Sequence, residues 1–382
     1  MINDTSKEFI KRHIGPSEED IDSMLKVVGA NSLDDLIKKT VPNNILLKDK
    51  LKIGDPTSEH ESMKQIKVIS EKNKLYTNYI GMGYYNTYMP NVVLRNIYCN
   101  PGWYTAYTPY QPEVAQGRLE MLLNFQHMVL DFTGMDIANA SLLDESTAAA
   151  EAIGLSRRLD KNNSNKVFIS RDCNPQTIDV IKTRTEVFGL KLVVGDQEKD
   201  LKSIEGNVVC GVLQYPGTLG DIKDPSEAIS KIHKKNGKAI LVCDLLALAK
   251  LKTPAELGAD IAVGNSQRFG IPMGYGGPHA AFFATKDEYK RAMPGRIIGV
   301  SVDRLGKKAL RMALQTREQH IRREKATSNI CTAQALLAII SAAYAIYHGP
   351  KGINQIAERI SKLAKSFADK IKKSGYELYS DS

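Results

Sequence analysis

Short runs of apolar residues recur at regular intervals in the middle of the chain. They are rich in Val, Ile and Ala and occupy residues 166–170, 190–195, 207–214, 238–244, 260–264 and 280–285. Most of them show no alternation of apolar and polar positions, as is typical of strands buried on both faces. Residues 174–188 and 225–236 have helical length and lie between such runs. The pattern predicts an α/β fold with a mainly parallel sheet, helices on both sides and right-handed crossovers.

Helical patterns flank this block. Residues 117–132 carry apolar side chains at helical spacing, and residues 144–159 predict a helix rich in small residues, capped by Asp144 or Ser146. Residues 1–72 predict a mainly helical arm, whose first helix has a capping box that starts at Ser17 and a stop at Gly29. Towards the carboxyl end, helices are predicted over 331–347 and 354–373, separated by a breaker at 348–350.

Tyrosines are concentrated between residues 76 and 112. They are Tyr76, Tyr79, Tyr84, Tyr85, Tyr88, Tyr98, Tyr104, Tyr107 and Tyr110. Glycines and prolines punctuate the same segment, which places these side chains largely on loops. Such tyrosines suit a subunit interface, since each has an apolar ring and a polar tip, and equally suit a pocket for a small polar substrate. Both interpretations stay open, and both hold if the pocket lies at an interface.

Composition is that of an ordinary globular protein, with 42% apolar and 25% charged residues in 382. The net charge of +9, from 52 basic and 43 acidic residues, comes from lysines spread along the chain. Because no basic stripe with interleaved aromatics occurs, we expect no nucleic-acid partner. No run reaches the roughly 18 apolar residues of a membrane span. The amino-terminal residues lack an apolar signal core, so we expect a bacterial cytoplasm, with a mitochondrial matrix as the alternative.

The cysteines are odd in number and well separated, at Cys99, Cys173, Cys210, Cys243 and Cys331. This spacing favours buried free thiols over a disulfide framework or a metal site.

The glycine-rich segment GNSQRFGIPMGYGGPH, residues 264–279, follows the apolar run that ends in Val263. A large class of pyridoxal-phosphate (PLP) enzymes places its Schiff-base lysine in a turn of this layout. Here Gln267, Arg268 and Phe269 occupy the turn, and no lysine occurs between Lys252 and Lys286. Arginine stays protonated at any useful pH and cannot form the imine. A domain with this turn therefore has the layout of a PLP enzyme but cannot catalyse the reaction alone, since it has no lysine to bind the cofactor.

Long stretches of the chain resemble the amino-terminal half of the glycine decarboxylase P-protein family, in its long single-chain form. These stretches are residues 9–25, 106–134, 138–152, 244–285, 293–303 and 309–338. The resemblance implies a fold-type-I PLP-dependent transferase-like large domain over residues 73–330, after a helical arm over 1–72. Residues 331–382 would be a linker helix and the start of an incomplete small domain. We therefore expect a fragment of a longer protein, whose missing half carries the cofactor lysine.

The resemblance also indicates which residues to consider for a site. Asp244 holds the position that pairs with the pyridine nitrogen of PLP, although a strand-end carboxylate capping the next helix is the favoured alternative. Ser146 and Thr147 lie where a helix amino-terminus would cradle the cofactor phosphate, although a packed helix cap is the favoured alternative without the cofactor. His279 could contact a ligand or be structural. The candidates for a substrate pocket or an interface are Tyr84, Tyr85, Tyr107, Thr108, Tyr110, Gln111 and Glu113. No metal site is expected.

The reaction implied by the resemblance converts glycine and a lipoyl-carrying H-protein into aminomethyl-lipoyl H-protein and carbon dioxide, with PLP as the electron sink. The implied partners are the carboxyl-terminal half, the H-protein with its lipoyl group as co-substrate, and a second full-length chain in a homodimer. Two alternatives remain open at this point. One is an independent PLP enzyme with a relocated lysine, and the other is a non-enzymatic binding or scaffold protein.

Overall fold

The computed structural model describes residues 15–49, 51–54, 57–104, 111–315, 319–328, 330 and 333–380. The chain divides into two compact units, residues 1–77 and residues 78–382. The three-part division at residues 72 and 330 stays a prediction. None of the helices in the described residues is long and apolar enough to cross a membrane.

The first unit is helical where it is described. Its helices are α2 (Glu18–Val28), α3 (Leu33–Thr40) and α4 (Glu59–Ser70). Each begins after a serine whose hydroxyl accepts a backbone N–H bond, which satisfies one of the free donors of the first turn. At α2 the predicted capping box between Ser17 and Asp20 is confirmed, and Gly29 ends the helix with φ 69°. The mainly helical content predicted for this part of the chain is therefore present in the described residues.

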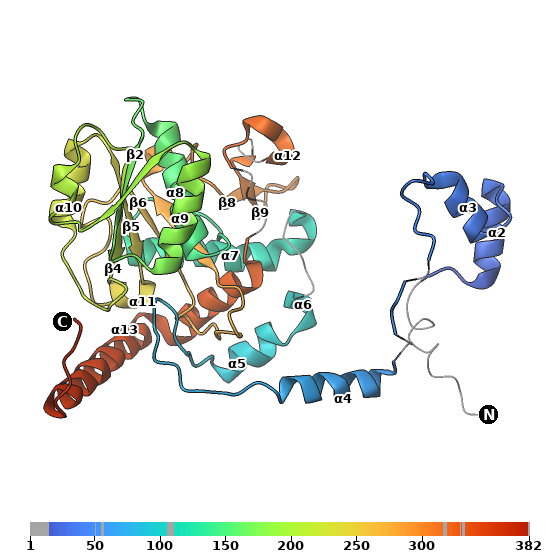
Figure 1. Ribbon diagram of the computed structural model, residues 1–382, viewed down its shortest axis with the longest axis horizontal. Coiled ribbons are helices and arrows are strands. Elements are labelled where there is room, and N and C mark those ends of the chain that lie inside the picture. Colours follow the sequence, from blue (N-terminus) through green and yellow to red (C-terminus); the bar gives the residue numbers. More distant parts are fainter. Residues whose placement is uncertain are drawn as a thin grey trace. The chain divides into compact units, whose positions relative to one another are not determined.

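The second unit is built around a seven-stranded sheet with the order β1-β7-β6-β5-β4-β2-β3. Its strands are β1 (Ile137–Ala138), β2 (Lys166–Ser170), β3 (Lys191–Gly195), β4 (Cys210–Tyr215), β5 (Lys238–Cys243), β6 (Ile261–Asn265) and β7 (Ala281–Thr285). Strands β2 to β6 pair in parallel, whereas β7 runs antiparallel between β6 and β1. The predicted mainly parallel sheet is confirmed, and Figure 1 shows it with its flanking helices.

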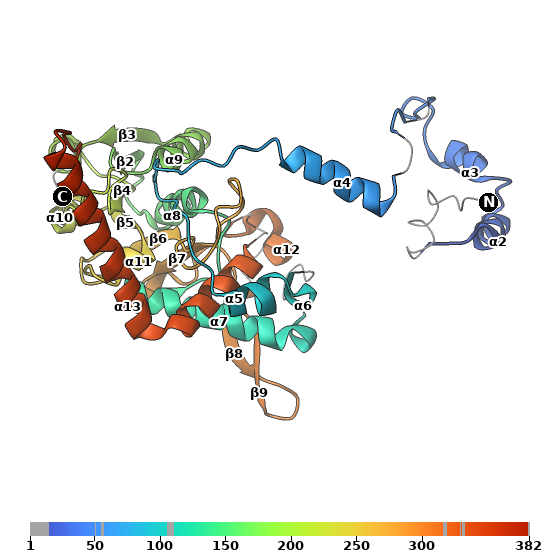
Figure 2. The same ribbon diagram turned by 90° about the horizontal axis from the view of Figure 1, so that it is seen from below.

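Helices cover both faces of this sheet. They are α7 (Pro112–Thr133), α8 (Glu145–Leu159), α9 (Pro175–Val187), α10 (Ser226–Lys234) and α11 (Leu245–Leu248). Helices α8 and α9 share one core, and α7, α10, α11 and α13 (Ala335–Lys373) share the other. In β5, Ile240 and Val242 enter the first core while Ala239 and Leu241 enter the second, so the strand is apolar at every position after Lys238. Figure 2 shows α10 and α13 on the opposite side of the strands from α8 and α9.

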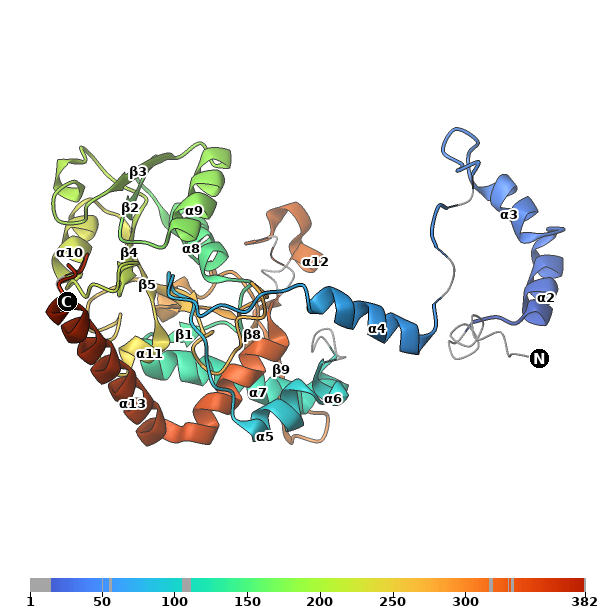
Figure 3. The same ribbon diagram turned by 60° about the horizontal axis from the view of Figure 1, so that its bottom comes forward.

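Helix α13 (Ala335–Lys373) contains a kink at Gly349, whose φ of 61° is not helical. The breaker predicted at residues 348–350 is thus confirmed: two helical parts meet at this kink, which Figure 3 shows. The first part of α13 packs against α7. This contact joins the carboxyl-terminal helix to the core of the second unit.

Some elements of the second unit were not predicted. Strands β8 (Ile297–Val302) and β9 (Lys308–Ala313) form a separate antiparallel pair. Helix α7 begins at Pro112, earlier than the predicted residue 117. The tyrosine segment is only partly irregular, because it includes α5 (Asn91–Val93), a π-helical turn (Leu94–Tyr98) and α6 (Pro101–Tyr104). A short helix, α12 (Gln319–Arg322), precedes α13.

Among the cysteines that the structure describes, Cys173, Cys210 and Cys243 are buried free thiols and Cys99 is exposed. Burial raises the pKa of each buried thiol, which keeps it protonated and unreactive. Cys331 lies outside the described residues.

Candidate functional site

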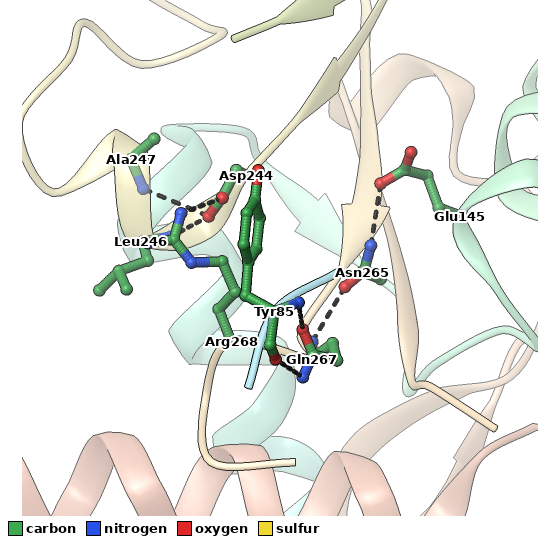
Figure 4. Close-up of polar contacts among 8 residues, drawn as sticks. All are labelled: Tyr85, Glu145, Asp244, Leu246, Ala247, Asn265, Gln267 and Arg268. Atoms are coloured by element: carbon green, nitrogen blue, oxygen red, sulfur yellow. Dashed lines mark hydrogen bonds and ion pairs between the residues drawn. The ribbon is translucent and has the colours of Figure 1, made fainter. Parts of the chain in front are cut away.

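The carboxyl ends of β5 and β6 lie side by side at one edge of the sheet, where α/β proteins of this kind place their sites. Asp244 directly follows β5, and Asn265 is the last residue of β6. The turn after β6 carries the arginine that replaces the expected lysine. We use the term Arg268 site for Tyr85, Glu145, Asp244, Asn265, Gln267 and Arg268, which are drawn in Figure 4.

Arg268 forms an ion pair with Asp244. Its Nη1 lies 2.5 Å from Oδ2 of Asp244, and both side chains are mostly buried. The other carboxylate oxygen of Asp244 accepts hydrogen bonds from the backbone N–H groups of Leu246 (2.8 Å) and Ala247 (3.3 Å), which caps α11. The guanidinium also lies over the ring of Tyr85, 5.1 Å from its centroid, a cation–π contact. Both oxygens of Asp244 are therefore engaged by residues of this chain.

Gln267 is fully buried and uses its side chain to hold two other segments. Its Oε1 accepts a hydrogen bond from the Tyr85 N–H (3.1 Å), and its Nε2 donates to the carbonyl oxygens of Tyr85 and Ile271 (2.7 Å each). Its own N–H donates to Oδ1 of Asn265 at 3.0 Å. The residue beside the lysine position thus ties the turn to residue 85 at both backbone groups.

Glu145, the first residue of α8, is a buried carboxylate with no cationic partner among the described residues. It accepts hydrogen bonds from Nδ2 of Asn174 and Nδ2 of Asn265, both at 2.9 Å, and from Oγ1 of Thr177 at 3.4 Å. Desolvation outweighs these neutral donors and raises the pKa of Glu145 to about 7. The first turn of α8 therefore already contains an acidic group.

The predicted phosphate-cradle residues have structural roles in the same turn. Asp144 rather than Ser146 caps α8, because its Oδ1 accepts the Thr147 N–H at 2.7 Å. The Ser146 hydroxyl is buried and lies 3.1 Å from Oγ1 of Thr177. Ser146 and Thr147 thus belong to the packed start of α8, next to Glu145.

A separate pocket of about 480 Å³ lies beside the site. We call it the Tyr84 pocket; it is lined by Tyr84, Leu143, Asp144, Met273, Gly276, Gly277, Pro278 and His279. The rings of Tyr84 and His279 stack at 4.6 Å between centroids. Burial lowers the pKa of His279, and its Nδ1 is buried without a hydrogen-bond partner among the described residues. This pocket brings together two of the predicted candidates, Tyr84 and His279, which lie far apart in the sequence.

The remaining predicted candidates are not seen at the Arg268 site or the Tyr84 pocket in the described part of the chain. Gln111 is exposed at the start of α7 and makes no capping bond, and Glu113 is exposed in its first turn. Tyr107, Thr108 and Tyr110 lie outside the described residues.

Glu145, Asn174 and Asn265 were not among the predicted site residues. The available signal was a polar residue at a strand end, as for Asn265 after the predicted run 260–264.

A mainly parallel sheet of this order, with a lysine-free turn after β6, defines a fold-type-I PLP-dependent enzyme domain in which arginine replaces the cofactor lysine. The family follows from direct comparison. A family model described as "Glycine cleavage system P-protein" matches residues 11–382, and the chain belongs to this family.

Relatives with similar sequences carry the name glycine dehydrogenase (decarboxylating). The protein from Pelagibacter ubique (strain HTCC1062) is 74% identical over 381 residues, which are 100% of this chain and 40% of that protein. The protein from Nostoc punctiforme (strain ATCC 29133 / PCC 73102) is 57% identical and is covered to 39%. The chain thus spans about 40% of the length of these relatives.

Solved structures agree with this assignment. A crystal structure of glycine decarboxylase (P-protein) of the glycine cleavage system, in inhibitor-bound form, is 35% identical with a TM-score of 0.83. The match covers 90% of this chain and 78% of that one. A sphingosine-1-phosphate lyase from Burkholderia pseudomallei K96243, 12% identical with a TM-score of 0.58, shares the fold alone.

The residues of the Arg268 site do not fit PLP. The turn has no amine for a covalent link, and the carboxylate of Asp244 is engaged by Arg268 and by the first turn of α11. Glu145 places a second carboxyl group at the first turn of α8, and its ionised form would oppose the charge of a phosphate there. This site therefore does not provide the cofactor chemistry of the family.

Proposed function

We propose that this chain is the amino-terminal, lysine-less half of a glycine decarboxylase and supports catalysis without holding the cofactor. The reaction is the conversion of glycine and lipoyl H-protein into aminomethyl-lipoyl H-protein and carbon dioxide. The observation that carries the proposal is the Arg268–Asp244 ion pair in the turn where a cofactor lysine would stand. A guanidinium cannot form the imine, so a lysine in the other part of the complete protein holds PLP.

The partners in this proposal are glycine, the H-protein with its lipoyl group as co-substrate, and the carboxyl-terminal half of the same enzyme. Two copies of the full-length chain form a homodimer, and the compartment is the bacterial cytoplasm. Support comes from the family and from the share of the relatives that the chain covers, 40% in the protein from Pelagibacter ubique. An independent PLP enzyme is disfavoured because the described turn offers no free amine beside Asp244.

The site of action proposed for this half is the wall of the Tyr84 pocket together with the tyrosine loops. Tyr84 and His279 line this pocket, and burial raises the pKa of the Tyr84 phenol, which keeps it a neutral donor. We assign the segments around Tyr84–Tyr85 and residues 107–113, including Tyr107, Thr108, Tyr110, Gln111 and Glu113, to closure over the cofactor of the other half. Asp244, Ser146, Thr147 and His279 then remain from a former cofactor site.

The test uses the complete protein and the variant Arg268→Ala. We expect the PLP content per chain to be unchanged, because the cofactor is held elsewhere. Borohydride reduction followed by peptide mapping should place the reduced PLP adduct on a lysine outside residues 1–382. An adduct within these residues, or loss of PLP in Arg268→Ala with the fold retained, would overturn the proposal.

A second measurement follows glycine decarboxylation as carbon dioxide exchange in the variant Tyr84→Phe. The exchange should fall because the phenol at the pocket wall is removed. The matched control is Tyr79→Phe, since Tyr79 is 82% exposed, and it should leave the exchange unchanged.

A further inference from the structure

The segment of residues 81–88 is held in place by side chains that are distant in the sequence. Gln267 binds both backbone groups of Tyr85, at 3.1 Å and 2.7 Å. Gln176 donates to the carbonyl oxygen of Met82 at 3.0 Å, and Thr87 donates to the carbonyl oxygen of Ile271 at 2.8 Å. The guanidinium of Arg268 covers the Tyr85 ring. Two consecutive residues of the turn after β6 therefore both act on residue 85.

The segment does not determine its own conformation. It has no helix or strand, and three consecutive residues, Gly81, Met82 and Gly83, have φ values of 71°, 56° and 89°. This backbone conformation is sterically unfavourable for Met82, which has a Cβ, but not for glycine. Gly83 approaches Asn174 so closely that a Cβ would lie 2.7 Å from Nδ2. Such a conformation persists only where the surroundings impose it.

The contacts that impose it continue into the interior. The N–H of Gln267 is bound by Asn265, whose Nδ2 donates to Glu145 at the start of α8. Gln267 is 0% exposed, and each polar atom of its amide is bonded. A hydrogen-bonded series therefore runs from α8 through the end of β6 to Tyr85. Figure 4 shows this series and the side of the Tyr85 ring against which Arg268 lies.

Tyr84 is the neighbour of the bound residue and forms the wall of the Tyr84 pocket with His279. Because the backbone of Tyr85 is bound on both sides, the direction of the Tyr84 side chain is fixed with it. We infer that Gln267 is a positioning residue, which orients Tyr84 towards the pocket from the turn that elsewhere carries a cofactor lysine. The inference rests on the proposed function, in which the Tyr84 pocket acts in glycine decarboxylation.

The test compares Gln267→Met with Gln126→Met in the complete protein. Gln126 is a matched control, because its side chain binds both backbone groups of Ile298 (2.7 Å and 3.1 Å) and is only 6% exposed. Hydrogen exchange followed by mass spectrometry should show residues 81–88 exchanging faster by about tenfold or more in Gln267→Met, since two bonds to Tyr85 are lost. In Gln126→Met the faster exchange should be confined to the region of Ile298.

Activity separates positioning from general stability. In Gln267→Met, kcat/KM for glycine should fall by about tenfold to a hundredfold through misplacement of the Tyr84 wall, with PLP content per chain unchanged. Gln126→Met should retain kcat/KM. Thr87→Val keeps the side-chain shape and removes one bond of the segment, so it should show a smaller change in the same direction even if Gln267→Met folds poorly.

Each part of the inference can fail separately. Unchanged exchange of residues 81–88 in both Gln267→Met and Thr87→Val would overturn the positioning role and leave the proposed function standing. Faster exchange with unchanged kcat/KM would overturn the link between this segment and catalysis. An equal loss of activity in Gln126→Met would assign the effect to stability and overturn the specific role of Gln267.

Discussion

Replacement of Glu145 by glutamine should give a protein whose free energy of unfolding, compared with that of wild type, rises with pH. Glu145 is buried among neutral donors, and desolvation raises its pKa from 4.5 to about 7. The unfolded chain therefore loses this proton near its ordinary pKa, and the folded chain loses it only near pH 7. Between these values the folded state binds more protons, so the free energy of unfolding falls as the pH rises.

The magnitude follows from the difference between the two pKa values. One pKa unit corresponds to about 1.4 kcal/mol, so full passage through the window costs the wild-type protein about 3 kcal/mol. Between pH 5 and pH 8 the expected change is about 2 to 3 kcal/mol, since part of the unfolded-state titration is complete at pH 5. In Glu145→Gln the side chain does not titrate, so this pH-dependent loss of stability is absent. Its stability relative to wild type should therefore rise by that amount, whatever constant effect the new amide has on Asn265.

The assay is urea unfolding followed by circular dichroism at several pH values between 5 and 8. The His279→Gln background should give the same Glu145-dependent difference, because the pH dependence is assigned to Glu145 and not to His279 of the adjacent pocket. Glu151→Gln serves as a second control, since Glu151 is buried but paired with Arg184 at 2.9 Å. A free-energy difference between Glu145→Gln and wild type that does not change with pH would refute the reasoning.

Two further predictions concern charged groups of the second unit. Arg268→Lys should not bind PLP covalently, because Asp244 keeps the new ammonium group protonated; a borohydride-reduced PLP adduct at position 268, detected by mass spectrometry, would contradict this. Asp260→Asn should lower the free energy of unfolding at pH 7, measured with urea, by about 2 kcal/mol. Burial opposes ionisation of Asp260, but hydrogen bonds from His233 and Lys286 outweigh it and lower the pKa from 3.8 to about 2. This stabilisation is present above pH 3.8 and is lost as the pH falls towards 2, so a cost that stayed constant over that range would count against it.

The sheet was predictable from the sequence because its strands are buried on both faces. In β5, every residue after Lys238 is buried, so its apolar run is continuous and easily recognised. The hairpin of β8 and β9 is different, since Val300 and Val302 are exposed and the run offers no such signal. For α7, Pro112 at the first helical position was an available signal for the earlier start.

The Arg268 site was only partly predictable. The replaced lysine is visible in the sequence, and so is Asp244 at a strand end. The partner of Gln267 is not, because Tyr85 lies 182 residues away along the chain. Likewise Glu145 and Asn265 are separated by 120 residues, and only the pairing of strands and helices brings them together. The sequence alone shows that the lysine is absent, whereas the contacts of Gln267 and Glu145 are seen only in the fold.

In the proposed function this domain supports catalysis without holding the cofactor, and the contacts around Arg268 and Glu145 bear on whether a cofactor site could return during evolution. A change at position 268 alone leaves the acidic first turn of α8, and a change at Glu145 alone leaves the amide groups of Asn174 and Asn265 without their acceptor. Either substitution alone therefore gives a protein in which a charge is uncompensated or a hydrogen-bond donor has lost its acceptor. Compensating substitutions of this kind would make the proposed division of roles between the two halves hard to reverse.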